Sequence, residues 1–480
     1  MKNIRTILLA MALTTATGSM AQSDLQQQFA NPPQEARPRV WWHWMNGNIS
    51  RDGIRKDLEW MNRAGLGGIH IFDAGKKTPQ VVPQRIIYMT PEWKECYAYA
   101  VALADSLGME ATMTATPGWS NTGGPWVKPS DAMKKLVWRE VTVKGGKTIN
   151  MTLPEPYSVS GAFQNIRARG TASSKTYYKD IAVVAVRTDG ELTLGEMGAK
   201  ATASNGAIDL TMLTDGDMAK TQKLTADSTG KVAWIKIELD KAYTIRALAL
   251  GDGRQHSQWR NKRPAPTKWL EASNDGLHFT KVCDLVLGGA PLTTVDITPT
   301  TARYFRVVWK TDRRPLAISE LNLFTSFRVN HAEEKAAFGT PVDLPLYPTP
   351  ETDKATALTD VIDLTHLTDS TGRLTWKAPM GRWRILRFGY SLTGKMNHPA
   401  SPEATGLEVD KMSAEAVQRY ISTYLATYVD ASRGMMGKRG LQNLLIDSYE
   451  AGIANWTPRM AEEFKARRGY ELLPWMPALA

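Results

Sequence analysis

The sequence predicts an α/β domain with a parallel sheet, interrupted by a long all-β region. Strand-like and helix-like segments alternate over residues 22–135 and again over 401–480. Between them, residues 136–400 contain short runs of alternating apolar and polar residues, many threonines and many turn residues. Alternating strands and helices are typical of parallel sheets with right-handed crossovers, whereas short alternating runs are typical of antiparallel β-structure. The interruption is far longer than any plain loop.

The first α/β part is predicted to hold three strands, at 40–45, 69–73 and 110–115, because each is a short apolar run that ends in turn residues. One helix is expected to begin at Ser50, which can accept an N-cap hydrogen bond before a run with apolar residues at helical spacing. A second is expected to begin at Thr90, which is followed by a proline suited to the first helical turn. Strand, helix, strand, helix, strand fits either a barrel or an open sheet.

The second α/β part, residues 401–480, is predicted to contain two further strands and two helices. A short strand at 406–410 precedes a long amphipathic helix that Ser413 can cap. A strand at 444–450 follows, and a last helix is expected over 457–469, where a glycine ends it.

Two carboxylates stand at the end of the strand predicted at 444–450, where three aliphatic residues run into Asp447, Ser448, Tyr449 and Glu450. Such an apolar run predicts a strand buried on both faces, and Tyr449 is expected in the core. Buried carboxylates without partners are costly, and barrel enzymes place catalytic groups where strands end. Asp447 and Glu450 are therefore candidates for chemistry. Alternatively, Asp447 caps a turn and Glu450 is solvated.

The N-terminus has the pattern of a secretory signal peptide over residues 1–21. Lys2 and Arg5 precede an apolar run, and small residues follow up to Ala21. That run is too short to cross a membrane, and no other transmembrane segment is predicted. The protein is expected to be exported, either to a periplasm or to the medium.

Composition excludes little but favours one ligand class. The formal net charge is +11, yet the basic residues are scattered rather than gathered in a stripe with aromatics, so nucleic acid is not expected as a partner. Cys96 and Cys283 lie far apart, which supports neither a disulfide scaffold nor a zinc site. The 16 tryptophans favour carbohydrate, because sugar rings stack on indoles, although tryptophan is also ordinary core material.

Residues 205–330 resemble a discoidin-like, galactose-binding jelly roll. The motifs that carry this resemblance are, in order, LTDGD at 213–217, WIKIEL at 234–239, IRAL at 245–248, LEASNDG at 270–276, ARYFRV at 302–307 and ISEL at 318–321. The flanking segments, 136–204 and 331–400, are predicted to be β-rich. Such modules are often structural, so ligand binding does not follow from the resemblance. The acidic turn Asp215–Asp217 could hold an ion, but solvated turn acids are the simpler interpretation.

The α/β parts resemble glycoside hydrolase family 106, the α-L-rhamnosidases. The matching stretches are PRVWWHWMNGN at 38–48, GGIHIFD at 67–73, TPGW at 116–119, GLEVDK at 406–411 and DSYE at 447–450. The resemblance implies a (β/α)-barrel interrupted by β-sandwich insertions, and inverting removal of terminal α-L-rhamnosyl residues from plant or bacterial glycans. It also implies an active-site calcium, whose ligands remain unassigned, and a catalytic pair, Asp447 and Glu450, with the glutamate as general acid. The family's second essential glutamate lies further downstream, so this chain is expected to be the N-terminal part of a longer protein and to lack the base.

Five residues near predicted strand ends are candidates for sugar binding: Trp42, His43, Asn46, Asp73 and Trp119. His43 alternates with Trp42, so the two side chains should point to opposite faces and only one of them can line the site. On the residues alone, a core histidine with satisfied hydrogen bonds is the simpler interpretation of His43. Asn46 and Asp73 suit sugar hydroxyls or a metal, although turn chemistry explains them equally simply. Trp119 is either a stacking platform or a packed loop anchor.

Two other classes of function compete with a hydrolase. A non-catalytic carbohydrate-binding protein would use the jelly roll and the tryptophan-rich strand end. A purely structural array of β-modules is disfavoured by the carboxylates at 447–450. Linkage specificity and oligomeric state are not predicted by the sequence.

The leader predicts where the mature chain begins. We expect signal peptidase to cut after Ala21, so that the exported protein starts at Gln22, because the small residues before that point fit the enzyme's specificity. N-terminal sequencing of protein recovered outside the cytoplasm checks this, and a chain that still begins at Met1 would contradict it.

Overall fold

The computed structural model describes residues 25–168, 172, 174–251, 267–286, 288–311, 314–339, 347–352 and 355–480, so the predicted leader lies outside the described residues. The chain divides into two compact units. The first holds the residues up to Trp126, together with 397–406 and 418–450. The second holds 127–396, 407–417 and 451–480.

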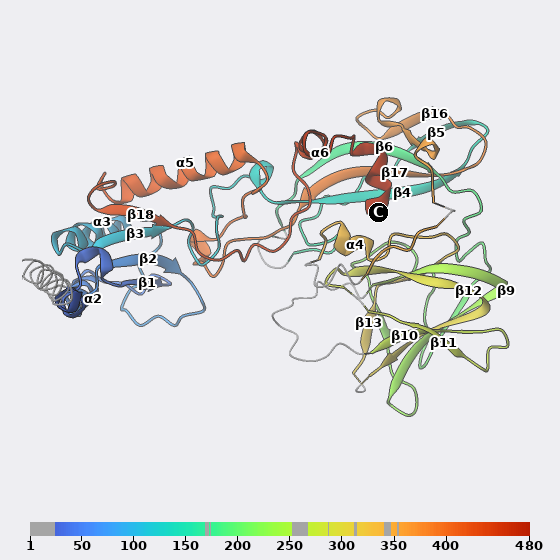
Figure 1. Cartoon of the computed structure of the whole chain (residues 1–480), viewed down its shortest axis with the longest axis horizontal. Helices are drawn as coiled ribbons and strands as arrows, with labels where there is room; N and C mark the ends of the chain where they lie inside the picture. Colours follow the sequence, from blue (N-terminus) through green and yellow to red (C-terminus); the bar gives the residue numbers. More distant parts are fainter. Residues whose placement is uncertain are drawn as a thin grey trace, which may run out of the picture. The chain divides into compact units, whose positions relative to one another are not determined.

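The first unit is built on a parallel sheet with the strand order β1-β2-β3-β18 (Figure 1). Its strands are β1 (Arg39–Met45), β2 (Gly68–Ala74), β3 (Glu110–Thr114) and β18 (Leu441–Leu445). The three strands predicted in the first α/β part and their parallel pairing are confirmed. In the described residues β1 and β18 are the two edge strands of this sheet. The described part is therefore an open α/β sheet, and its closure into a barrel stays a prediction.

Two helices connect the first three strands, as predicted. The helix α2 (Arg51–Arg63) begins after Ser50, whose Oγ accepts a hydrogen bond from the Gly53 amide at 3.1 Å. The helix α3 (Pro91–Ser106) begins after Thr90. Packing of α3 on the sheet is aromatic: Trp44 of β1 meets Trp93 of α3 with ring centroids 5.6 Å apart, and both indoles are buried.

The long helix α5 (Ala414–Ala431) fixes the end of β3 through buried tyrosines. Tyr424 donates a hydrogen bond to the Thr114 carbonyl at 2.7 Å, and Tyr420 donates one to the Ala115 carbonyl at 2.5 Å. Each of these hydroxyls satisfies a backbone oxygen just where β3 ends. The loop that follows β3 therefore leaves the sheet from a fixed point.

The prediction that 444–450 is a strand buried on both faces is wrong. The strand β18 ends at Leu445, and the side chains around that point are exposed: Leu444 by 38%, Ile446 by 60% and Tyr449 by 60%. Tyr449 is therefore not a core residue. The physical reason is that β18 pairs only with β3 among the described strands, so nothing described there covers its outer side.

The second unit contains a four-stranded antiparallel sheet with the order β15-β6-β17-β4 and a small two-stranded sheet beside it. The strands of these sheets are β4 (Lys134–Lys144), β5 (Thr148–Thr152), β6 (Tyr178–Arg187), β15 (Val361–Asp363), β16 (Arg373–Lys377) and β17 (Arg382–Leu392). They come from both flanks of the predicted jelly roll, which explains why 136–204 and 331–400 have the same β texture. The short helix α4 (Ala332–Lys335) stands at the start of the second flank.

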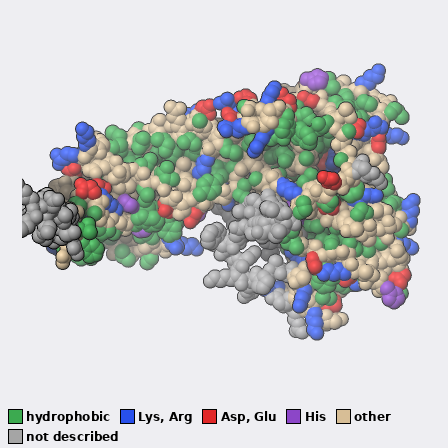
Figure 2. All heavy atoms as spheres, viewed as in Figure 1, with side chains coloured by type: hydrophobic (Ala, Val, Ile, Leu, Met, Phe, Trp, Pro, Cys, Tyr) green, Lys and Arg blue, Asp and Glu red, His purple; other side chains and the backbone are tan. Residues whose placement is uncertain are grey.

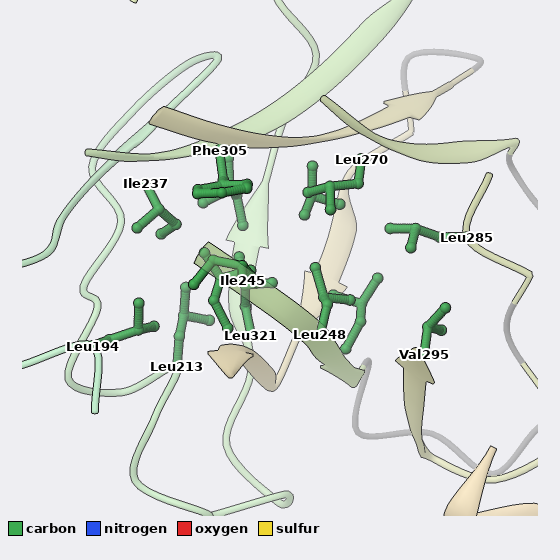
Figure 3. Packing of buried hydrophobic residues seen from close by; sticks show 14 of the residues in the cluster. Leu194, Leu213, Ile237, Ile245, Leu248, Leu270, Leu285, Val295, Phe305 and Leu321 are labelled. Carbon is green, nitrogen blue, oxygen red and sulfur yellow. The ribbon is translucent and has the colours of Figure 1, made fainter. Parts of the chain in front are cut away.

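A larger antiparallel sheet, β11-β10-β12-β9-β14 with β7 paired to β9, is built from strands within residues 200–324. Its strands are β7 (Lys200–Ala203), β9 (Val232–Gly251), β10 (Lys268–Ser273), β11 (Thr280–Asp284), β12 (Leu292–Lys310) and β14 (Glu320–Phe324), and β8 (Gln222–Leu224) pairs with β13 (Leu316–Ile318). Buried aliphatic side chains around Phe305 form one core between them (Figure 3). This is the all-β structure that the sequence predicts, and the more specific assignment to a jelly roll stays a prediction.

Residues 451–480 belong to the second unit, whereas the sequence analysis assigned them to the resumed α/β domain. The helix α6 (Met460–Arg468) is present near the predicted place and ends at Gly469. Its Met460 and Phe464, together with the buried Met476, pack on the core that contains Leu136 and Val184. Helical periodicity does not tell which core a helix joins, so the sequence could not make this assignment.

The described helices include none that is long and apolar enough to cross a membrane. On the face shown in Figure 2, acidic and basic side chains are interspersed over the surface.

The core around Phe305 predicts a large loss of stability on truncation. Phe305 is fully buried, so Phe305→Ala should lower the free energy of unfolding by about 3–5 kcal/mol, through lost burial and the cavity left behind. Leu277→Ala is the control, because Leu277 is 80% exposed and its removal should change stability by less than about 0.5 kcal/mol. Urea titration followed by tryptophan fluorescence measures both, and equal losses in the two variants would contradict the assigned core.

Candidate active site

A loop that follows β3 carries Trp119, and two backbone contacts fix it. Gly118 donates a hydrogen bond to the carbonyl of Asp73 at 2.7 Å, and the Trp119 amide donates one to the carbonyl of His398 at 2.9 Å. Gly118 has φ +81°, and a Cβ there would lie 2.7 Å from the carbonyl carbon of His398. Only glycine permits this conformation and this close approach. The loop after β3 and the segment around His398 are therefore held backbone to backbone.

Trp119 and His43 form a hydrogen-bonded pair beside β1. The indole Nε1 of Trp119 donates to Nε2 of His43 at 3.2 Å, and the His43 ring packs on Phe72 with centroids 5.1 Å apart. Burial lowers the pKa of His43 below its ordinary value, which favours the neutral ring that can accept this hydrogen bond. Of the two candidates on opposite faces of β1, His43 is thus the one that lies with Trp119.

Trp42 lies on the other face of β1 and does not join this group. Its indole is 8% exposed and donates from Nε1 to the Asp57 carboxylate at 3.0 Å, on helix α2. The prediction that Trp42 binds substrate is therefore not supported by its position. The physical reason is the two-residue period of a strand, which turns Trp42 and Trp44 towards the helices.

Glu450 lies beyond β18, beside a histidine that the sequence analysis did not single out. Nε2 of His398 is 3.3 Å from Oε2 of Glu450, and the side chains are 52% and 46% exposed. Nδ1 of His398 is 3.5 Å from Oγ of Ser120, next to Trp119 in the loop after β3. Sequence reasoning missed His398 because it lies at the end of the segment predicted to be β-rich, 331–400, and outside any strand. Its place before a proline, close to the motif at 406–411, was the available signal.

The segment Asn397–Gly406 is anchored within the first unit by its own polar side chains. The side-chain Nδ2 of Asn397 donates to the carbonyls of Pro117 and Ala404, at 2.9 and 3.0 Å, and its Oδ1 accepts from the backbone amide of Gly406 at 2.8 Å. Asn397 is buried, so each of these bonds replaces lost hydration. Because the backbone of Asn397 is held in this way, the position of the next residue, His398, is also fixed.

Asp447 also follows β18, and its Oδ2 accepts a hydrogen bond from Ser448 Oγ at 2.7 Å. The two predicted catalytic carboxyls are thus both in the stretch after the carboxyl end of a parallel strand, where such sheets place reactive groups.

Asp73 and Asn46 have mainly structural surroundings. Asp73 is only 4% exposed, its Oδ1 lies 3.5 Å from Ser401 Oγ, and burial raises the pKa of its carboxyl to about 7. Asn46 has φ 55° in a turn, and its carbonyl accepts from Arg85 Nε at 2.8 Å. These positions fit the turn chemistry that the sequence offered as the alternative, rather than contacts to a sugar.

The described residues contain no cluster of acidic or histidine side chains that would bind the calcium ion implied by the family resemblance. No three His, Cys, Asp or Glu side chains of the described ranges gather as a metal site would require. Calcium takes six to eight oxygen ligands and usually several carboxylates. Calcium therefore stays a prediction.

The buried carboxyl of Asp73 predicts a pH-dependent stability. A folded-state pKa of about 7, well above that of the unfolded chain, means that stability is lost as the pH rises towards and through 7. Asp73→Asn keeps the shape without the charge. The stability of this variant relative to the wild type should therefore rise by about 2–4 kcal/mol between pH 4 and pH 8. Urea denaturation at several pH values measures the difference, and a difference that does not change with pH would refute the assignment.

Comparison with known proteins identifies the family. The family model described as alpha-L-rhamnosidase, glycoside hydrolase family 106, matches residues 30–480. A solved structure, a rhamnosidase from Novosphingobium sp. PP1Y, is 40% identical to this chain, with a TM-score of 0.85. The match covers 95% of this chain and 42% of the rhamnosidase. A Formosa agariphila protein named "Putative beta-glucuronidase" is 28% identical over 459 residues, which are 95% of this chain and 26% of that protein. This chain thus spans less than half the length of either relative. It belongs to the alpha-L-rhamnosidase family, glycoside hydrolase family 106.

Proposed function

We propose that the protein is an exported glycoside hydrolase that removes terminal α-L-rhamnosyl residues from oligosaccharides by inversion, with Glu450 as its general acid. The observation that carries the proposal is the position of Glu450 beyond a parallel strand and in contact with His398, which itself contacts Ser120 in the loop of Trp119. Family membership over residues 30–480 supports the substrate class. The pattern of residues 1–21 supports export.

In this mechanism the carboxyl of Glu450 gives its proton to the glycosidic oxygen as the bond to the anomeric carbon breaks. A water attacks that carbon from the opposite face and passes a proton to a second carboxylate. Inverting enzymes place these two groups about 6.5–9.5 Å apart, on opposite sides of the sugar. Asp447 is only three positions from Glu450, so it suits an electrostatic neighbour of the acid rather than the base.

Trp119 is suited to hold a sugar ring. Its indole is partly exposed, and His43 fixes its orientation through Nε1. The ammonium of Lys76 stands 5.0 Å from the ring centroid, so a sugar would stack on the other face or displace this exposed side chain. Stacking of a deoxysugar on a fixed indole provides binding energy without hydrogen bonds.

The variant Glu450→Gln, made in the full-length protein, tests the acid role. The amide cannot release a proton, so kcat/KM for an alkyl rhamnoside should fall by about 10²–10⁴-fold. The loss should be much smaller for a nitrophenyl rhamnoside, whose leaving group needs no protonation. Asp447→Asn should reduce both activities alike, because it removes charge near the oxocarbenium-like transition state.

Glu462→Gln is the matched control, since Glu462 is 70% exposed on α6 and should tolerate the change. Equal losses of Glu450→Gln on the two substrates would exclude the acid role. A nitrophenyl glucuronide tests the function in the name of the Formosa relative, and hydrolysis of that substrate alone would refute the rhamnoside assignment.

A further inference from the structure

His398 is held by its backbone, independently of its ring. Its amide donates to Ser120 Oγ at 3.1 Å, and its carbonyl accepts from the Trp119 amide at 2.9 Å. Ser120 is 3% exposed, so water does not compete for these contacts. A substitution of His398 therefore leaves both backbone contacts available and changes only what the ring does.

The ring of His398 spans from the loop after β3 to the segment after β18. Nδ1 lies 3.5 Å from Ser120 Oγ, and Nε2 lies 3.3 Å from Glu450 Oε2. A neutral imidazole carries one hydrogen, so one of its nitrogens donates while the other accepts. When the serine hydroxyl is directed at Nδ1, the hydrogen is on Nε2 and points at the carboxylate.

Glu450 lies on an exposed piece of chain beyond the end of β18. It comes after the end of β18, at the end of a run in which Ser448 and Tyr449 are also exposed. An unrestrained glutamate side chain has up to about 2 kcal/mol of rotamer entropy to lose when it is fixed in one orientation. A misplacement of about 1 Å can cost a reaction about 100-fold. A carboxyl at such an exposed position needs a hydrogen-bond partner to hold one orientation.

We propose that His398 is a positioning residue, which holds the Glu450 carboxyl through Nε2 and aims it at the leaving oxygen. The inference rests on the acid role proposed for Glu450. After Glu450 has given its proton to the departing oxygen, Nε2–H donates to the carboxylate and stabilises it until a proton from solvent restores the acid.

Two substitutions separate this role from loop packing. The amide nitrogen of a glutamine can reach about as far as Nε2, whereas that of an asparagine reaches only about as far as Nδ1. His398→Gln should therefore keep a donor at Glu450 and lose less than about 3-fold in kcat. His398→Asn keeps a partner for Ser120 but loses the one for Glu450. Its kcat on an alkyl rhamnoside should fall about 10–100-fold with KM nearly unchanged, and much less on a nitrophenyl rhamnoside.

The opposite ranking, with the glutamine variant as damaged as the asparagine variant or more so, would show that the ring only packs the loop and would overturn the inference. An unimpaired His398→Asn would overturn it as well. If Glu450→Gln is inactive while His398→Asn is fully active, only the positioning role fails. If Glu450→Gln itself keeps full activity on the alkyl rhamnoside, the acid role fails and the positioning role fails with it.

A measurement on this chain tests the contact without any turnover. Long-range ¹H–¹⁵N spectra report which ring nitrogen of a histidine carries the hydrogen. The ring signals of His398 should shift when Glu450→Gln replaces the carboxylate, and should stay unchanged in Glu462→Gln. Ring signals of His398 that do not respond to Glu450→Gln would refute the contact, whatever the rates show.

Discussion

The candidate site depends on the approach of two backbones, that of Gly118 in the loop after β3 and that of the segment around His398. A side chain at position 118 would collide with the carbonyl of His398, so the distance between these segments is set by the absence of a Cβ. Trp119 donates its amide across this contact, and Ser120 accepts from the other side. The indole that suits a sugar and the histidine beside Glu450 are thus placed by the same few hydrogen bonds. Tyr420 and Tyr424 of α5 support them by fixing the point where the loop leaves the sheet.

The sequence was sufficient where local chemistry decides the structure. Ser50 and Thr90 start their helices as expected, and the first three strands pair in parallel, because caps, apolar periodicity and strand alternation are local signals. Alternation also predicted that His43 and Trp42 would part, although only the structure showed which of them meets Trp119. The sequence failed where the decision lies in distant neighbours. The apolar residues near Leu444 looked buried, but β18 has one described partner strand, and α6 joined a core that its own periodicity does not specify.

His398 shows the same limit in the site itself. A histidine between an asparagine and a proline has no periodic pattern around it, and nothing in its neighbourhood indicates Glu450. The pair exists because Asn397 secures its segment to the loop after β3. Asp73 is the converse case: its residue type and its place at a strand end suggested a ligand, while its burial gives it a position in the scaffold. Residue type suggested the chemistry available in this chain, and tertiary contacts decided which residues could take part.

The contact between Ser120 and His398 can form only late, because the ribosome makes these two residues at very different times. Ser120 and His398 are 278 residues apart, and the whole segment 127–396 of the other unit is made between them. At about 5–20 residues per second, the loop with Trp119 waits on the order of tens of seconds for its partner. During that time Gly118 and Trp119 cannot make their contacts with His398. Contacts of such long range also close slowly once the partner is present. Nascent chains of this protein would therefore present an unfinished, aromatic strand end while the intervening segment is made, and a holding chaperone or an export factor that recognises aromatic segments would find it there.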